Sequence, residues 1–167
     1  MLDITLYSDI DGDKKADYVV YKPSESQYQI HLASCLNKPD AESCGNQGKS
    51  NVISVTIGTK TSRAIPEDYD GDGKVDLATW TPETGEWKIA FAKDFLGSNN
   101  DSTQKSFVLG KPGDIPMPGD YNGDGKADIA IYHLDTSELE IDYDDNTKKK
   151  INLSKYKDYI PASFIGI

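Results

Sequence analysis

The sequence predicts an all-β protein made of three four-stranded antiparallel repeats of the β-propeller blade type, followed by one C-terminal strand of a partial further blade. Three observations predict this fold. An acidic nine-residue segment occurs three times, beginning at Asp9, Asp68 and Asp120, with spacings of 59 and 52 residues. Each copy precedes a short run rich in β-branched and aromatic residues, which is typical of a strand. Repeat periods of this length indicate propellers or solenoids.

The same four strands are expected in each repeat: an extended piece before the acidic segment, a strand after it, a third after a polar turn, and a fourth after a variable link. The expected strands cover residues 4–7, 17–21, 28–32 and 52–57, then 63–66, 76–80, 87–91 and 106–109, then 115–118, 128–132, 139–143 and 150–153. Four antiparallel strands make one propeller blade. A single repeat domain over residues 1–167 therefore divides into blades at about 3–58, 62–110 and 113–154, with a partial blade or closing strand at about 158–167.

The acidic segments are predicted to be calcium loops. Calcium takes six to eight oxygen ligands from carboxylates, backbone carbonyls and water. Each segment has oxygen-bearing side chains at positions 1, 3, 5 and 9, and the backbone carbonyl at position 7 can point inward. The expected ligands, for up to three calcium ions, are Asp9, Asp11, Asp13, Lys15 and Asp17, then Asp68, Asp70, Asp72, Lys74 and Asp76, then Asp120, Asn122, Asp124, Lys126 and Asp128.

Solvated turns and EF-hands contain the same residue types as these segments. Asp and Gly dominate solvated turns, but three copies in phase, each before a strand, favour ion binding. An EF-hand needs Glu at position 12 and flanking helices, whereas position 12 is Val20, Thr79 or Ile131 and strands are predicted on both sides. The first copy has Lys14 where the others have glycine at position 6, so its loop is expected to be distorted or looser.

Residues 68–78, together with the Thr-Gly-Glu-Trp segment at 84–87, resemble the FG-GAP or VCBS repeat of integrin α-subunit propellers and bacterial secreted proteins. The resemblance implies a secreted bacterial protein, extracellular or at a cell surface, with structural calcium and a role in adhesion or partner binding. Its partners would be protein or glycan ligands on a cell surface or matrix. Propellers of this family usually have seven blades, so three repeats imply a module of a larger protein, further blades or a homo-oligomer.

Composition excludes several partners. A net charge of −10 argues against nucleic acid, whose phosphates attract basic surfaces. Three calcium ions would bring this charge to about −4. The sequence contains no apolar run near the roughly 20 residues that span a bilayer. The start has no basic region or apolar core of a signal peptide, so a mature segment is expected if the protein is secreted.

The two cysteines, Cys35 and Cys44, lie in one polar stretch with eight residues between them. A local disulfide is expected, and it suits an oxidising compartment. Free thiols and a metal site are the alternatives. This insertion is also a candidate for partner contact.

Aromatic residues recur at equivalent repeat positions: Tyr21, Trp80 and Tyr132 at one, and Tyr28, Trp87 and Leu139 at another. Packing between neighbouring blades explains such recurrence. The alternative function is an accessory carbohydrate-binding, lectin-like module of a secreted hydrolase, with a sugar platform at Phe95 or in an inserted loop.

No catalytic residue is predicted, and the chain is not expected to be an enzyme. His31 and His133 occupy different repeat positions and are expected to face solvent or a blade edge. The sequence contains no Gly-x-Ser-x-Gly elbow, phosphate loop or His-Glu-x-x-His segment.

Overall fold

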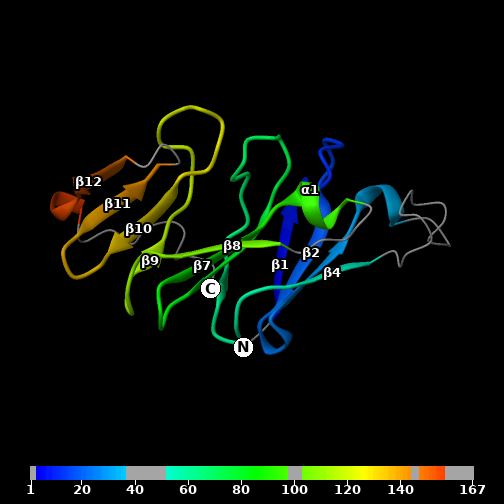
Figure 1. The fold of residues 1–167 in the computed structure, drawn as a ribbon, viewed down its shortest axis with the longest axis horizontal. Coiled ribbons are helices and arrows are strands. Elements are labelled where there is room, and N and C mark those ends of the chain that lie inside the picture. The colour runs from blue at the N-terminus through cyan, green and yellow to red at the C-terminus, as the bar shows by residue number, and fades with distance from the viewer. Residues whose placement is uncertain (1–2, 37–51, 98–102, 144–146, 157–167) are drawn as a thin grey trace.

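A computed structural model describes residues 3–36, 52–97, 103–143 and 147–156 of the chain. It contains three four-stranded antiparallel sheets that lie side by side along the long axis of the molecule (Figure 1). The strands are β1 (Ile4–Ser8), β2 (Asp17–Lys22), β3 (Gln27–His31) and β4 (Ile53–Thr56), then β5 (Arg63–Ala64), β6 (Leu77–Thr81), β7 (Glu86–Ala90) and β8 (Gln104–Val108), then β9 (Ile115–Pro116), β10 (Ile129–His133), β11 (Glu138–Asp142) and β12 (Lys148–Asn152). The predicted all-β class and the three four-stranded repeats are confirmed.

Within each sheet the strands follow one another in sequence order, as in a meander. The first strands β5 and β9 are shorter than expected, because Pro66 and Pro118 have no amide hydrogen to donate to the neighbouring strand. Pairing continues past them through the bridges Glu67 to Asp76 and Gly119 to Asp128. The first strand of these repeats is therefore interrupted just before the acidic loop.

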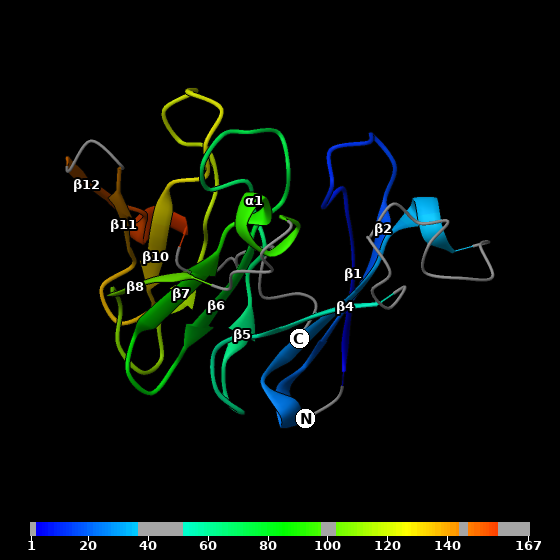
Figure 2. The same ribbon diagram turned by 45° about the vertical axis from the view of Figure 1, so that its right-hand side comes forward.

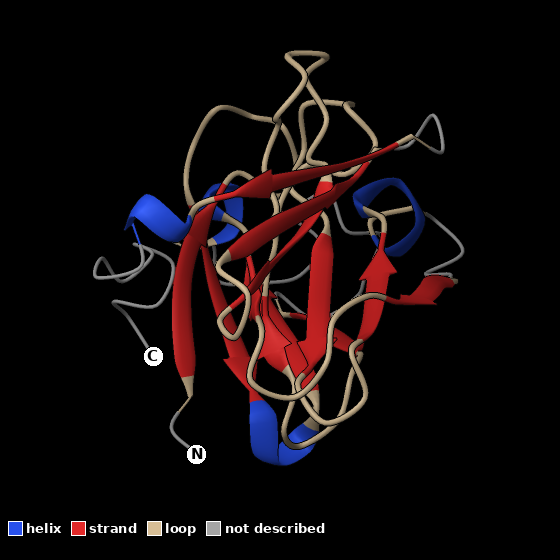
Figure 3. Ribbon diagram, turned by 90° about the vertical axis from the view of Figure 1, so that its left-hand side faces the viewer, coloured by secondary structure: helices blue, strands red, loops and turns tan. Residues whose placement is uncertain are grey.

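Helices are few and short among the described residues (Figure 3). They are the 3₁₀ turns η1 (Pro23–Glu25), η2 (Ala33–Cys35) and η4 (Ser154–Tyr156), and the four-residue α1 (Ala92–Phe95). None of these described helices is long and apolar enough to cross a membrane. Cys35 is buried at the end of η2, while Cys44 lies outside the described residues, so the disulfide stays a prediction. The C-terminal strand expected at 158–167 also lies outside them.

The turn between the second and third strands has four residues in each sheet, and its last residue has the same backbone conformation. Its last residue, Ser26, Gly85 or Ser137, has a φ between 52° and 69°, in the left-handed region. The carbonyl of this residue accepts the amide of the residue that ends the fourth-strand segment, Ile57, Leu109 or Leu153, at 2.7–2.9 Å. This hydrogen bond joins the start and the end of the hairpin that the third and fourth strands form in each sheet.

The core lies between adjacent sheets. Tyr21 and Tyr28 of the first sheet are fully buried in one cluster with Leu77 of the second. The Tyr28 hydroxyl donates to the carbonyl of Ala78 at 2.7 Å. Phe95 belongs to the same cluster and is only 3% exposed, so its prediction as a sugar platform is wrong: the short helix α1 turns its ring into the core.

The second and third sheets meet around two tryptophans. Trp80 and Trp87 are fully buried against Ile131 of the third sheet. Both indole N–H groups donate to the carbonyl of Leu109, at 3.1 and 3.0 Å. The prediction that the recurring aromatics pack between blades is confirmed for these two junctions.

Candidate metal sites in the repeated loops

The three acidic loops join the first and second strands of their sheets and project from the same side of the molecule, the top in Figures 1 and 2. In each loop the position-1 carboxylate is bound by the amides of positions 4 and 6. In the second loop Gly71 and Gly73 donate to Asp68 at 2.7 and 2.8 Å. This pattern wraps the loop around its first aspartate.

The position-9 aspartate fixes the loop to the body of the sheet. Asp17 and Asp76 are completely buried, and Asp128 is 4% exposed. One oxygen of Asp76 accepts the amide of Tyr69 within the loop at 2.9 Å, and the other accepts the amide of Ala92 after the third strand at 2.8 Å. Burial, and to a lesser degree the charges of Asp70 and Asp68, raise the pKa of Asp76 to about 6. A cation beside this carboxylate would offset the free-energy cost of burying its charged form.

Two loops bring three carboxylates together. One oxygen from each of the aspartates at positions 1, 3 and 9 lies within 4.8 Å of the others in the first and second loops; these triads are Asp9, Asp11 and Asp17, and Asp68, Asp70 and Asp76. The third loop has Asn122 at position 3, between Asp120 and Asp128. An all-oxygen donor set with clustered negative charge fits a hard cation such as calcium.

The remaining expected ligands lie beside these triads. The position-5 aspartates are not members of them, and each accepts the amide of position 7 at 2.9 Å; the pairs are Asp13 with Lys15, Asp72 with Lys74, and Asp124 with Lys126. The ammonium of Lys15 also lies 2.7 Å from Asp13. Without a cation, the position-5 carboxylate is thus held by its own loop.

The first loop is not distorted by Lys14. This residue has a φ of 66°, close to the 83° and 88° of Gly73 and Gly125 at the same position. Its amide donates to Asp9 at 2.9 Å, as the two glycines donate to their position-1 aspartates. The expected distortion is therefore absent from the backbone, and Lys14 instead carries the steric cost of a left-handed conformation.

The second loop has one ion pair that the sequence does not predict. The ammonium of Lys93, in helix α1, lies 2.6 Å from Asp70. Lys93 follows Ala92, whose amide binds Asp76, so the helix start places a positive charge against the triad. The sequence offers no signal for this contact, because it depends on the turn that the chain takes after β7.

Neighbouring loops are also joined to one another. The amide of Val75 donates to the carbonyl of Asp9 at 3.0 Å, and the amide of Ala127 donates to the carbonyl of Asp68 at 2.8 Å. The position-7 lysine packs its stem on the preceding loop: a Cβ added to Gly12 would lie 3.2 Å from Cγ of Lys74. The loops therefore form a linked row.

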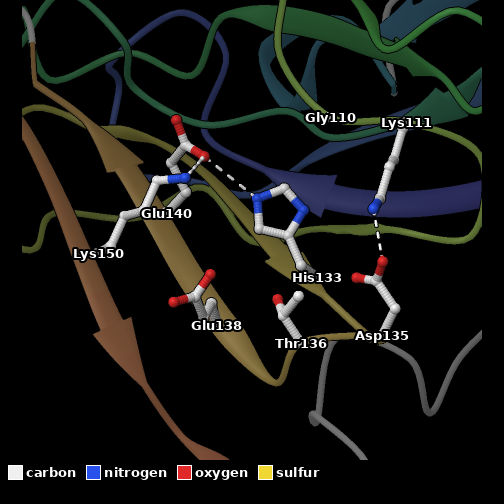
Figure 4. A pocket seen from close by; sticks show the side chains of 8 residues that line it. All are labelled: Gly110, Lys111, His133, Asp135, Thr136, Glu138, Glu140 and Lys150. Atoms are coloured by element: carbon white, nitrogen blue, oxygen red, sulfur yellow. Dashed lines mark hydrogen bonds and ion pairs between the residues drawn. The ribbon is translucent and has the colours of Figure 1, made fainter.

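A second polar cluster lies at the end of β10 that is far from the third acidic loop. Nδ1 of His133 is 2.8 Å from Asp114. Its Nε2 is 3.2 Å from Glu140, whose carboxylate is also 3.1 Å from the Lys150 ammonium (Figure 4). The His133 side chain is only 15% exposed, so it does not face open solvent, and its expected place at a blade edge stays a prediction. Burial raises the pKa of Glu140, but the hydrogen bonds from Lys150 and His133 outweigh this effect and lower it overall.

The position of this cluster follows the repeat. Ser62 and Thr81, which occupy the equivalent places in the second sheet, form a buried hydroxyl pair at 2.8 Å. The third repeat replaces that neutral pair with Asp114 and His133. The alignment of repeats was the signal that could have found the contact.

The three blade-like sheets, their similar junctions and the acidic loops on one side fit a β-propeller-type repeat module. A family model described as the FG-GAP-like repeat matches residues 68–131, from the first residue of the second loop into β10. The resemblance to FG-GAP-like repeats is thus confirmed, and this segment includes the second and third acidic loops. No curated protein and no solved structure gives a significant match to the chain.

Proposed function

We propose that this chain is a non-enzymatic, calcium-stabilised β-propeller module of a secreted, extracellular or cell-surface protein that mediates adhesion or partner binding. The observation that carries the proposal is the pair of equivalent aspartate triads, each with one fully buried carboxylate. Calcium is structural in this proposal, since it would neutralise a carboxylate that the fold has already taken out of water.

The residues at positions 1, 3 and 9 would hold the ion. The ammonium of Lys93 already lies 2.6 Å from Asp70, so this carboxylate would share its negative charge between the ion and the ammonium. If each site binds with a Kd of about 10 μM, millimolar calcium adds about 2.7 kcal/mol per occupied site by mass action. For a chain of this length that corresponds to a rise in Tm of about 5–10 °C per site.

The test compares thermal unfolding in millimolar calcium, millimolar magnesium and EGTA. The variant Asp70→Asn removes one charge from the second triad, and Asn122 already shows that an amide fits position 3 of such a loop. Asp135→Asn is the matched control: it makes the same change at an exposed carboxylate near the opposite end of the repeat. A Tm raised selectively by calcium, with a smaller rise for Asp70→Asn only, would support the proposal. An unchanged Tm in calcium would refute it.

The second candidate is an accessory carbohydrate-binding module. Tyr156 keeps 48% of its surface exposed, and an exposed aromatic face offers a broad contact area for a sugar ring. Binding on a glycan array that is lost in Tyr156→Ala would favour this function. Binding to matrix proteins that survives the same substitution would favour protein adhesion.

A further inference from the structure

The contact between consecutive repeats has a fixed pattern at the acidic loops. At both junctions the position-8 amide of the later loop donates to the position-1 carbonyl of the earlier one, Val75 to Asp9 and Ala127 to Asp68. The position-2 side chain of the earlier loop is buried against the later repeat: Ile10 is 0% exposed and Tyr69 is 8% exposed. Each junction thus has a carbonyl half and an amide half.

Within residues 3–36, 52–97, 103–143 and 147–156, the carbonyl half of the third repeat has no matching amide half. Tyr121 occupies position 2 there and is 40% exposed, although its hydroxyl donates to the Met117 carbonyl as that of Tyr69 does to Ile65. A Cβ on Gly123 would meet no atom within 4 Å. A Cβ added to its counterpart Gly71 would lie 2.8 Å from Cγ of Lys126, which covers that glycine. Among the described residues, the carbonyl of Asp120 has no hydrogen-bond partner.

The amide half of the first repeat likewise has no matching carbonyl half among the residues that the structure describes. Ala16 occupies position 8 and is exposed, and its amide has no partner within the described part of the chain. The side chain of Lys15, at position 7, is 64% exposed, compared with 34% for Lys74 in the second loop. The group that would cover Gly123 is therefore available at the other end of the same chain.

We propose that a second copy of this chain docks head to tail, with the first repeat of one copy against the third repeat of the other. The amide of Ala16 would donate to the carbonyl of Asp120, the stem of Lys15 would cover Gly123, and Tyr121 would be buried as Tyr69 is. This contact continues the junction that already holds the repeats together, and the chain carries both of its halves. A heterologous contact of this kind closes into a ring if its rotation permits.

The experiment measures the sedimentation of the chain over roughly 1 to 100 μM, with and without calcium, a range that covers a micromolar Kd. Mass above 18.4 kDa that grows with concentration in either buffer is expected. Tyr121→Glu and Ala16→Glu are each expected to reduce the mass to that of the monomer. Ala16→Glu should leave Tm nearly unchanged, whereas Tyr121→Glu also loses the hydrogen bond to the Met117 carbonyl and should lower Tm modestly. The control Val108→Glu changes a side chain that is 69% exposed on the edge strand β8, and should leave association intact.

Mixing the two defective variants distinguishes the possible geometries. Tyr121→Glu retains a native first repeat and Ala16→Glu retains a native third repeat, so a mixture can form one native junction. Heterodimers in the mixture, but not in either variant alone, are expected. A wild-type chain that is monomeric in both buffers would overturn the proposal. So would association that both variants retain, or a mixture that stays monomeric.

Discussion

Lys14 offers a direct test of the backbone cost in the first loop. With a φ of 66° it occupies a conformation that costs an L-residue roughly 1–2 kcal/mol and costs glycine little. Replacing it by glycine also loosens the unfolded chain, which offsets about 0.4–1 kcal/mol. Lys14→Gly is therefore expected to raise the free energy of unfolding by about 1 kcal/mol, or about 2–4 °C in Tm for a chain of this length.

The assay is reversible thermal or urea unfolding, and two matched variants isolate the cause. Lys14→Ala removes the same charge but keeps the strain, so it should fall about 1 kcal/mol below Lys14→Gly. Gly73→Lys makes the reverse change in the second loop, where an added Cβ meets nothing within 4 Å, and should destabilise by a similar amount. Equal stability of Lys14→Gly and Lys14→Ala would show that the left-handed conformation is not what distinguishes the loops.

Two further predictions follow from buried groups. In calcium-free buffer the folded chain holds the Asp76 proton more tightly than the unfolded chain, because its pKa rises from 3.8 to about 6. Stability is thus lost as pH rises through this window, by up to about 3 kcal/mol; urea titrations at several pH values should show this slope in the wild type and a weaker one in Asp76→Asn. Gly85→Ser should destabilise by about 2–4 kcal/mol although Ser137 occupies the equivalent place, since a Cβ at position 85 would overlap the carbonyl oxygen of Gly110. Gly113→Ser, with no atom within 4 Å, should show only the left-handed cost of about 1–2 kcal/mol, and equal losses in the two variants would contradict the steric argument.

Much of the fold could be predicted because each repeat contains the same sequence pattern, an acidic loop followed by a strand-forming run. Asp-Gly-Asp-Gly sets a turn, and the residues from Leu77 to Thr81 that follow have no competing helical pattern. The strand boundaries differ from the expected ones mainly at β5 and β9, where prolines limit pairing. The turns and strands that depend on neighbouring residues could therefore be predicted from the sequence.

The parts that sequence could not predict depend on distant partners. The Lys93 contact with Asp70 and the burial of Phe95 both arise from the short helix α1, whose direction is set by packing on the first sheet. The contacts of His133 could not be predicted from the sequence, because its partners Asp114 and Glu140 are separated from it in sequence and meet it only across the sheet. The two halves of the repeat junction differ in exposure, as Tyr69 and Tyr121 do, and sequence alone does not specify exposure.

The row of joined loops has a consequence for how the molecule would respond to a ligand. Asp68 uses its side chain to shape its own loop and its carbonyl to receive the amide of Ala127 from the next one. Any movement of Asp68 when a cation binds the second loop would therefore be transmitted to the third loop through this backbone hydrogen bond. Titration of the loops should then depart from independent binding, and neighbouring sheets should stiffen together rather than one at a time.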